Sequence, residues 1–577
     1  MTNIKIWAPE AESMMLILDQ QKLPMAVNGA GWWSIETSLV KHDTDYAFSV
    51  DEAGPFPDPR SGSQPAGVHG LSRWVDHGKF QWSDHNWQQQ PLASAVIYEL
   101  HIGTFTDEGT FDSASSKLNY LVGLGITHIE LMPVAEFPGC RGWGYDGVHL
   151  YAPHSAYGGP DGLKRFVNTC HQLGLAVVLD VVYNHLGPSG NYLSKYGPYF
   201  TKKYSTPWGE AVNFDGAHSD EVRRFFIDNA LMWLRDYHID GLRVDAVHAI
   251  IDSSAQHFLK QLAQEVESLQ TQCSKHFFLI AESDLNDPRV IEPRELGGYG
   301  LPAQWNEDFH HALHTQLTGE DNGYYQDFGT LDQLAKSLSR GFVYDGCYSK
   351  FRKRKHGAPS PTLTGANFVG YLQNHDQIGN RALGDRINQS LTLGQTKIGA
   401  ALVLTSPFIP MLFQGEEWAA TTPFLYFTDH QDQTLADAVS NGRKKEFASF
   451  GWSGDEIPDP QDEDTFQRSK LRWSEQSFDD NSVILAWYRN LLALRKEFPE
   501  LMPSGFSNVT VKLDTGNDWL LMMRGGVSVV INFATRPCTL SLDEAEQQSL
   551  ILGSEDSITK NGKVVYLPAH SVAIFVF

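Results

Sequence analysis

Residues 238–248 read H-I-D-G-L-R-V-D-A-V-H and combine the composition of a buried strand with two charged side chains. The apolar residues, the bounding Gly241 and the amphipathic run before them favour a strand. Arg243 and Asp245 are costly inside such a strand unless they pair or take part in chemistry. Two interpretations stay open at this point: a buried Arg–Asp bridge that only holds a loop, or one strand end of an active site.

The chain around this stretch alternates between strand-like and helix-like segments from residue 95 onward. Strands are predicted at 96–100, 128–132, 176–182, 241–245, 277–282, 303–305, 368–373 and 408–413, with helices at 162–173, 219–237 and 254–269 between some of them. Eight such units over roughly 400 residues predict an α/β fold, a (β/α)8 TIM barrel with enlarged βα-loops. The longest early insertion, 183–217, follows the third strand, and we expect it to stand over the barrel mouth.

The two ends of the chain have a different pattern. Short strand-like segments separated by Gly, Pro and Asp turns occupy the first 80 residues, and similar segments follow the helix-like run 486–496. Such spacing is typical of antiparallel sheets. We therefore predict an N-terminal β-sandwich at 1–85, the barrel at 92–500 and a C-terminal β-sandwich at 501–577.

Bulk properties exclude several classes of function. The net charge of −24 disfavours nucleic acid as a partner, and the one dense basic run, 350–356, is interpreted as a loop on the barrel rim. The five cysteines are scattered, which indicates neither a disulfide framework nor a zinc site. No signal peptide and no membrane span are recognised, so we expect a cytoplasmic protein without a membrane partner.

Polar residues stand at the ends of several predicted strands, at positions where a buried core would normally have apolar residues. Asp180, Asn184 and His185 end the third strand, His248 follows the fourth, Glu282 the fifth, and N-H-D-Q at 374–377 the seventh. Each one alone has an alternative as a satisfied buried polar group. Because the carboxyl ends of barrel strands meet at one face, we expect all of them in one active site.

Three carboxylates in this set, Asp245, Glu282 and Asp376, match the requirements of glycoside cleavage. That reaction needs one carboxylate as nucleophile and one carboxylic acid that protonates the leaving oxygen. Arg243 should keep Asp245 ionised, whereas Glu282 follows an apolar run with no cation beside it in sequence, which suits a proton donor. Neither a metal cluster nor a phosphate-binding glycine loop is recognised, so no cofactor is predicted.

The segments D-V-V-Y-N-H, G-L-R-V-D-A-V-H, I-A-E-S and Q-N-H-D resemble the four signature regions of the α-amylase superfamily, in the same order. The resemblance implies that Asp245 is the nucleophile, Glu282 the acid/base and Asp376 the transition-state stabiliser. It also implies a site for the reacting sugar, made by His185, Arg243, His375, Tyr145 and Asp146. Asn184 occupies a position that ligates calcium in many amylases, but no acidic loop cluster supports a calcium site here.

Finer motifs narrow the resemblance within the superfamily. W-G-Y-D-G-V-H-L-Y-A-P, N-H-D-Q-I-G-N-R-A and G-R-K-K-E-F are similar to segments of the maltooligosyltrehalose trehalohydrolase family, whereas branching enzymes usually read S-H-D-E after strand seven. The implied reaction is retaining hydrolysis of the α-1,4 bond next to a terminal trehalose. The alternatives are a branching enzyme, a generic α-glucan hydrolase, or a glycan-binding protein with an inactive barrel.

The same resemblance implies partners and further substrate contacts. The substrates would be maltooligosyltrehalose and related α-glucans, with maltooligosyltrehalose synthase as the functional partner. The leaving disaccharide would meet residues after strands six and seven: Glu307, Asp308, His310, His311, Gln377 and Asn380. An ordinary polar loop is the alternative for the first four.

Overall fold

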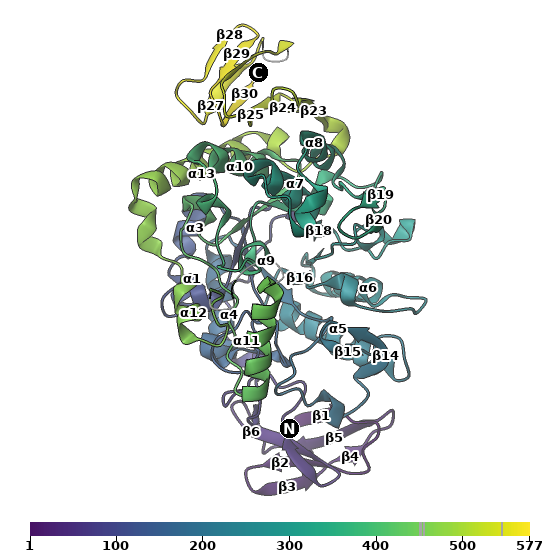
Figure 1. Cartoon of the computed structure of the whole chain (residues 1–577). Coiled ribbons are helices and arrows are strands. Elements are labelled where there is room, and N and C mark those ends of the chain that lie inside the picture. The colour runs from purple at the N-terminus through teal and green to yellow at the C-terminus, as the bar shows by residue number, and fades with distance from the viewer. Residues whose placement is uncertain (449–452, 454–455, 544–545) are drawn as a thin grey trace.

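Eight parallel strands form a closed barrel at the centre of the molecule (Figure 1). The computed structural model describes residues 1–448, 453, 456–543 and 546–577. Around the barrel the strands are β9 (Ile97–Leu100), β10 (His128–Leu131), β13 (Ala176–Val181), β16 (Gly241–Val244), β17 (Phe278–Ala281), β18 (Ala303–Trp305), β21 (Phe368–Tyr371) and β22 (Ile409–Phe413), which returns to β9. Each lies within its predicted range, so the predicted barrel is confirmed.

Helices cover the outside of the barrel, which explains why its strands read as apolar runs: both faces of the sheet are buried. The longer helices are α4 (Gly159–Gln172), α5 (Ser219–Asp236), α6 (Phe258–Cys273), α7 (Glu307–Thr318), α8 (Leu331–Arg340), α10 (Leu393–Thr405), α11 (Gln433–Ala448) and α13 (Asp479–Glu497). The shorter ones are α1 (Ile102–Phe105), α2 (Phe111–Ser115), α3 (Leu118–Leu124), α9 (His375–Gly379) and α12 (Glu463–Arg468).

Helix α6 begins four residues later than the sequence predicts. The predicted start, Ser254, donates no helical bond there; its hydroxyl accepts from the buried Arg223 guanidinium at 2.7 Å. The helix begins at Phe258, after His257, whose Nδ1 accepts the N–H of Leu259 at 3.2 Å. A long-range arginine contact therefore decides this helix start, which local propensity cannot reveal.

Antiparallel sheets flank the barrel at opposite ends of the molecule (Figure 1). At the N-terminus one sheet contains β1 (Thr2–Trp7), β5 (Trp32–Thr37) and β4 (Ala26–Val27), and the other β3 (Gln21–Pro24), β2 (Met14–Leu18), β6 (Asp45–Val50), β7 (Ala53–Phe56) and β8 (Ser72–Arg73). The C-terminal sheets are β23 (Val509–Asp514), β24 (Trp519–Arg524), β25 (Val527–Asn532), β30 (Ser571–Val576) and β27 (Ser549–Gly553), and β26 (Cys538–Ser541), β29 (Val564–Leu567) and β28 (Thr559–Asn561). The flanking β domains are thus confirmed, while their exact limits stay predictions.

Three small hairpins belong to the long loops. The insertion after β13 folds into β14 (Phe200–Thr206) and β15 (Gly209–Val212), and the loop after β10 carries β11 (Ala135–Glu136) and β12 (His149–Pro153). The basic run 350–356 forms the turn between β19 (Asp345–Ser349) and β20 (Arg354–Gly357). None of the described helices is long and apolar enough to cross a membrane.

Candidate active site

Arg243, on β16, is fully buried at the centre of the predicted site. Its Nη1 donates to Asp180 Oδ2 and to Asp245 Oδ1, both at 2.7 Å, and its Nη2 lies 3.4 Å from Glu282 Oε2. The guanidinium also lies over the ring of Trp305, 4.2 Å from the ring centroid. One buried cation thus touches three carboxylates from three neighbouring strands, which offsets the cost of burying each charge.

Asp245 follows the last residue of β16 and is buried. Besides the contact with Arg243, its Oδ2 accepts from Asn184 Nδ2 at 2.7 Å, and the same amide donates to the Asp245 carbonyl at 2.9 Å. Both carboxylate oxygens therefore accept hydrogen bonds, and these two bonds fix the orientation of the group. Asn184, predicted among the polar residues at the active-site end of the third strand, orients Asp245 in this structure.

Glu282 directly follows β17 and faces Asp245 across the strand pair. Its Oε2 accepts the N–H of Ala246 at 2.5 Å, an orientation that depends on the left-handed backbone of Ala246 at φ 38°. Burial raises the pKa of Glu282; Arg243 opposes that rise, and the negative charges of Asp245 and Asp376 add to it. A carboxyl group that keeps its proton beside an ionised one has the property of a general acid.

No cation stands beside Glu282 in the sequence, but the fold brings Arg243 to it. Arg243 precedes Glu282 by 39 positions in the sequence. The two lie close in space because Arg243 pairs with Ile280 in the β16–β17 ladder. The guanidinium therefore reaches both members of the acid–nucleophile pair. The direction of the Glu282 shift still agrees with a proton donor, because burial exceeds the effect of the cation.

Asp376 and His375 lie in α9, directly after β21. Asp376 is partly exposed; its Oδ1 accepts from Asn380 Nδ2 at 3.2 Å, and its Oδ2 lies 3.5 Å from His375 Nε2. His375 is buried against Glu99 of β9, which binds both its ring Nδ1 and its backbone N–H. Burial lowers the pKa of His375, but Asp376 and Glu99 outweigh burial and raise it to about 9. The imidazolium is thus a second buried cation at the barrel mouth.

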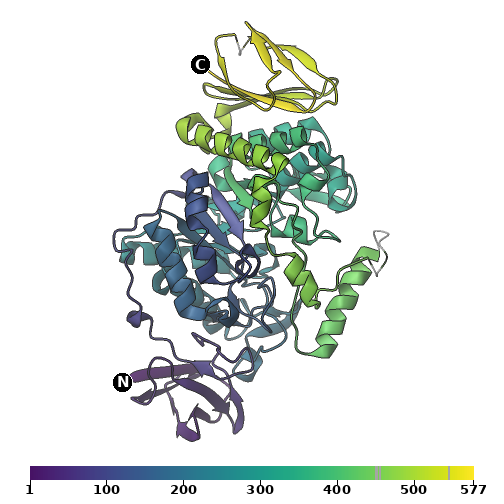
Figure 2. The same cartoon turned by 90° about the vertical axis from the view of Figure 1, so that its left-hand side faces the viewer.

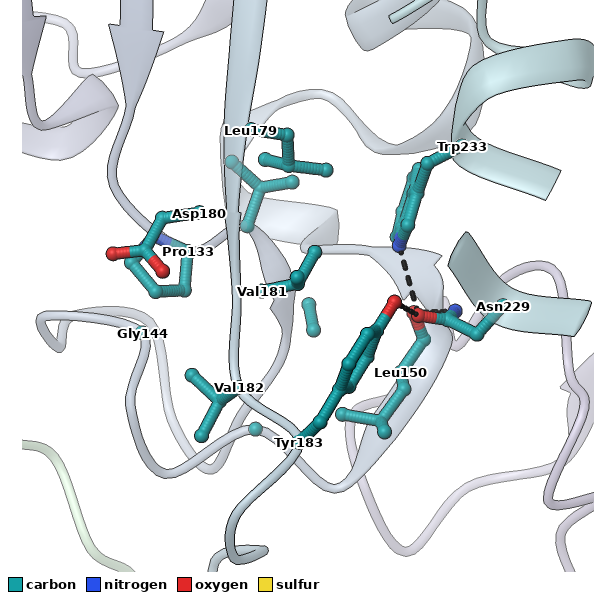
Figure 3. A pocket seen from close by; sticks show the side chains of 13 residues that line it. Pro133, Gly144, Leu150, Leu179, Asp180, Val181, Val182, Tyr183, Asn229 and Trp233 are labelled. Carbon is teal, nitrogen blue, oxygen red and sulfur yellow. Dashed lines mark hydrogen bonds between the residues drawn. The ribbon is translucent and has the colours of Figure 1, made fainter. Parts of the chain in front are cut away.

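Tyr145 connects these two cations. Its hydroxyl donates to Asp180 Oδ2 at 2.6 Å and lies 2.7 Å from His375 Nε2, and its ring is stacked on the imidazole at 5.2 Å. Burial raises the pKa of Asp180 to about 7, although Arg243 opposes the rise. Figure 3 shows that consecutive side chains of β13 point to opposite sides of the strand. Asp180 points to one side, and Leu179 points to the other, toward α5.

The outward face of this strand is held by a small polar group. Asn229 Oδ1 accepts from the Tyr183 hydroxyl at 2.7 Å and from Trp233 Nε1 at 3.1 Å (Figure 3). The first bond ties the segment that follows β13 to α5, and the second, between two residues of α5, orients the Asn229 amide. They keep the strand in the register that points Asp180 at Arg243.

Asp146 and His185 lie on the side of the β10 and β13 loops, as predicted for residues around the reacting sugar. His185 Nε2 lies 3.1 Å from the carbonyl of Tyr145, and its ring is stacked on Trp208 at 4.4 Å with an interplanar angle of 5°. Asp146 Oδ2 lies 3.7 Å from His430 Nε2, on the loop after β22. Both predicted residues therefore meet residues from other loops at the mouth of the barrel.

Glu307 and His248 lie on the opposite side, with the β17 and β18 loops. Burial raises the pKa of Glu307 well above its ordinary value, and the charges of Asp284, Glu282 and Asp376 add to it. His248 Nδ1 lies 3.9 Å from Asp284 Oδ1. The structure thus brings Glu307 into the electrostatic range of the catalytic carboxylates, although it is 25 residues beyond Glu282.

Asp308 and His310 use their polar atoms inside the fold. Asp308 Oδ2 accepts from Asn286 Nδ2 at 2.7 Å and from the N–H groups of Val343 and Tyr344 at 2.6 and 2.8 Å. The two ring nitrogens of His310 lie 2.8 Å from the Leu372 carbonyl and 3.2 Å from the Tyr325 hydroxyl. These contacts favour a structural role over the predicted sugar contact.

His311 and Gln377 surround the same tyrosine. Burial lowers the pKa of His311 to about 3, so the imidazole is neutral, and its ring lies 4.9 Å from Tyr324 and 5.2 Å from Tyr325. Gln377 Oε1 accepts weakly from the Tyr325 hydroxyl at 3.5 Å. Neither side chain has its hydrogen-bonding capacity filled by these contacts.

Sequence reasoning missed Glu99, Trp305 and Trp208. Glu99 had a signal, since it is a carboxylate inside the apolar strand 96–100, the same pattern that singled out Asp245. The other two had none: Trp305 ends a short strand, and Trp208 lies in a hairpin turn whose position over His185 only the fold decides. Within the described part of the chain, no group of three His, Cys, Asp or Glu side chains has an arrangement that suits a metal ion.

Comparisons with known proteins agree with this geometry. Residues 74–206 match the family model for the alpha amylase catalytic domain. The chain is 49% identical over 578 residues to a malto-oligosyltrehalose trehalohydrolase of Rhizobium sp. (strain M-11), covering 99% of this chain and 96% of that protein. A 1,4-alpha-glucan branching enzyme of Pseudoalteromonas atlantica is 26% identical, covering 96% of this chain and 75% of that enzyme.

A solved structure extends the comparison to three dimensions. The crystal structure of a Salmonella typhimurium protein attributed to the alpha amylases superposes with a TM-score of 0.91 at 40% identity, covering 100% of this chain and 97% of that chain. The similarity therefore includes the barrel and both flanking β domains.

Proposed function

Because the chain belongs to the malto-oligosyltrehalose trehalohydrolases, glycoside hydrolases of the α-amylase family, we propose that it cleaves the α-1,4-glucosidic bond next to the terminal trehalose of maltooligosyltrehalose. The products are free trehalose and a maltooligosaccharide. The contacts of Asp245 and Glu282 with Arg243, and the place of Asp376 beside His375, support a retaining mechanism with two chemical steps.

In the first step Asp245 attacks the anomeric carbon of the glucosyl residue, and the bond to the leaving oxygen breaks. Glu282 transfers its proton to that oxygen, so trehalose leaves as a neutral alcohol. The observation that carries these roles is the Arg243 guanidinium, which bonds to Asp245 at 2.7 Å and lies farther from Glu282 at 3.4 Å. The closer contact holds the Asp245 carboxylate in place for attack, while burial raises the pKa of Glu282 and so favours its protonated form.

In the second step the ionised Glu282 accepts a proton from water, and the oxygen of that water attacks the same anomeric carbon. The bond to Asp245 breaks, the sugar keeps its original anomeric configuration, and both carboxyl groups return to their starting states. Asp376, held by Asn380 and close to His375, binds hydroxyls of the reacting sugar.

The choice of bond depends on the leaving side. Trehalose has no reducing end, so a site that distinguishes it from maltose must bind hydroxyls that maltose presents elsewhere. Glu307 and His311 supply a protonated carboxyl group and a neutral imidazole on that side. Polar groups left unpaired by the wrong ligand make such discrimination strong.

Product analysis on a single defined substrate tests this proposal. With maltopentaosyltrehalose we expect trehalose and maltopentaose in equal amounts. A branching enzyme would instead produce α-1,6-linked chains, and a generic α-glucan hydrolase would produce a mixture of maltooligosaccharides. The Asp245→Asn variant serves as the inactive control.

The proposed reaction also implies a partner enzyme and a location in the cell. The substrate must come from an enzyme that converts the reducing end of a maltooligosaccharide into trehalose, so a maltooligosyltrehalose synthase is the expected functional partner. The cytoplasmic location is likewise proposed, since both enzymes would act on intracellular α-glucans.

A further inference from the structure

The direction of the substrate across the barrel follows from the order of the strands. In the closed barrel β18 lies opposite β10, and β17 lies opposite β9. Glu282 and Glu307, which follow β17 and β18, therefore mark one side of the mouth, where the leaving group departs. The glycone, the chain on the far side of the broken bond, must extend over the loops after β10, β13 and β22.

An open pocket with a volume of about 760 Å³ lies on that glycone side. Its lining combines residues from three segments far apart in sequence: His69, Pro188, Ser189, Gly190, Asn191, Tyr192, Gln431, Asp432, Thr434, Leu435 and Ala438. Helix α11, which supplies the last of them, stands beside the barrel between the two terminal β domains (Figure 2).

Two segments that line the pocket also approach Asp146 of the predicted sugar site. Gly187 packs so closely on the backbone of Asp146 that a Cβ there would lie 2.2 Å from the Asp146 carbonyl oxygen. On the other side His430 lies 3.7 Å from the Asp146 carboxylate. The next residue after each of these neighbours, Pro188 and Gln431, already belongs to the pocket lining.

The lining has the chemistry of a site for a neutral, hydroxyl-rich chain. It offers hydroxyl and amide groups from Ser189, Asn191, Tyr192, Gln431 and Thr434 and contains one carboxylate, Asp432. Pockets of about 300–1,000 Å³ with a few placed polar groups are typical of ligand sites.

One wall of the pocket is built by the N-terminal part of the chain. His69 Nδ1 lies 2.8 Å from the Tyr192 hydroxyl, and Ser189 Oγ lies 3.4 Å from His69 Nε2. The Tyr192 ring also contacts Phe56 of β7 at 5.6 Å. The wall is therefore held in place before any ligand arrives, which lowers the entropic cost of binding.

We propose that this pocket binds the glycone chain of the α-1,4-glucan and thereby sets the preference for longer substrates. The inference rests on the proposed function, because it assumes that Glu282 marks the leaving side. It assigns a binding role to segments outside the barrel strands: the His69 segment, residues 188–192 and the start of α11.

Filling the pocket without touching the catalytic groups tests this assignment. Ala438 is exposed on α11 and lines the pocket, so Ala438→Trp would occupy it, and Thr434→Trp would do so one turn earlier. Ala438→Ser is the matched control, because it alters the same position and leaves the space open. The substrates are maltosyltrehalose and maltoheptaosyltrehalose.

We expect both tryptophan variants to lower kcat/KM for maltoheptaosyltrehalose about tenfold, as the loss of one good sugar contact would. Maltosyltrehalose, whose glycone ends before the pocket, should be cleaved at the rate of the unmodified enzyme, and Ala438→Ser should behave as the unmodified enzyme on both. An equal loss on both substrates, or no loss on the longer one, would overturn the assignment.

Plain maltooligosaccharides separate this inference from the proposed function. If the unmodified enzyme released no trehalose, the proposed function would fail, yet cleavage of maltoheptaose and maltotriose would still report the pocket. In that case, if the unmodified enzyme prefers maltoheptaose over maltotriose and Ala438→Trp does not, the result supports binding of the glycone in the pocket. A preference that survives in both tryptophan variants counts against it.

Discussion

The Nη1 of Arg243 lies 2.7 Å from Oδ1 of Asp245, which is two residues further along the chain and directly follows the last residue of β16. Both side chains are buried, so the contact is a charge-assisted bond in a medium of low dielectric. It fixes the orientation of the carboxylate beside the guanidinium. The roles proposed for the other two carboxylates depend on this relationship, because only an ionised Asp245 can act as the nucleophile.

Asp245→Asn should leave the fold intact and abolish covalent catalysis. The amide is nearly isosteric, but its single oxygen can accept from only one of the two donors, Arg243 and Asn184, that bind Asp245. We therefore expect the fold to persist, with a melting temperature lowered by a few degrees at most. Removing a nucleophile costs on the order of 10⁴-fold or more in kcat. Steady-state kinetics on maltopentaosyltrehalose measures the loss, with Asp332→Asn on the exposed face of α8 as control. Near-normal turnover by a pure sample would refute the role of Asp245.

The pH profile should report Glu282. Its pKa is raised, mainly by burial, so the acid keeps its proton above the usual range of a glutamic acid, and kcat/KM falls as the pH rises through that pKa. Glu282→Gln should remove this basic limb. The same variant should recover activity on an aryl maltooligosaccharide, whose phenolate leaves without a proton. A basic limb that persists in Glu282→Gln would assign it to another group.

The stereochemical outcome is a further expectation. Retaining glycosidases hold their two carboxyl groups about 5–5.5 Å apart, which leaves no room for a water between the nucleophile and the sugar. The new reducing end should therefore appear first as the α anomer. Proton NMR during the first minutes, before mutarotation, distinguishes the outcomes. Initial release of the β anomer would show an inverting reaction and a different catalytic pair.

The preference for trehalose over maltose as the leaving group should depend on Glu307 and His311. The unmodified enzyme should cleave maltopentaosyltrehalose much faster than maltoheptaose, which contains the same number of glucose units. Glu307→Gln or His311→Ala should reduce the ratio of the two kcat/KM values by about tenfold or more, because unpaired polar groups no longer penalise the wrong ligand. The exposed Asp321→Asn, just beyond α7, is the control. A ratio near one in the unmodified enzyme would leave a generic α-glucan hydrolase.

Arg443 should act as a positioning residue for Asp376. Its Nη2 donates to the carbonyls of Gly379 and Arg381 at 2.5 and 3.3 Å, at the C-terminal end of the short helix that carries Asp376. Misplacement of a catalytic group by about 1 Å can cost 10²-fold, so Arg443→Met should lower kcat at least about tenfold and change KM less. Lys445→Met is the control, because Lys445 is exposed on α11, the helix that also carries Arg443. A change in KM alone would indicate that Arg443 only shapes the binding loop.

Much of this architecture was accessible from the sequence, because the decisive patterns are local. All eight barrel strands lie within the predicted ranges, and most of them read as apolar runs because both faces of a barrel strand are buried. The three-residue β18, A-Q-W, had the weakest signal because it is short and contains the polar Gln304. Asp245 and Glu282 could be identified for a related reason: a carboxylate at the end of an apolar strand is too costly without a partner or a function.

Contacts between distant segments were not accessible in this way. The cation beside Glu282, the use of Asp308 to hold the backbone at 343–344 and the stacking of Trp208 on His185 depend on strand register and loop packing. The late start of α6 has the same origin, since Arg223 binds the residues that local propensity assigns to the helix.

The sequence by itself determined the barrel, its flanking sheets and the three carboxylates, because periodicity and the cost of a buried charge act over a few residues. Only the tertiary structure decided which charges surround Glu282 and where the pocket that we propose for the glycone lies. The protonation state of Glu282 depends on burial and on charges from β16 and α9, and the pocket walls come from the His69 segment, the β13 loop and α11. Electrostatic and steric effects of that kind act through space, so they appear only when the strands and loops are brought together.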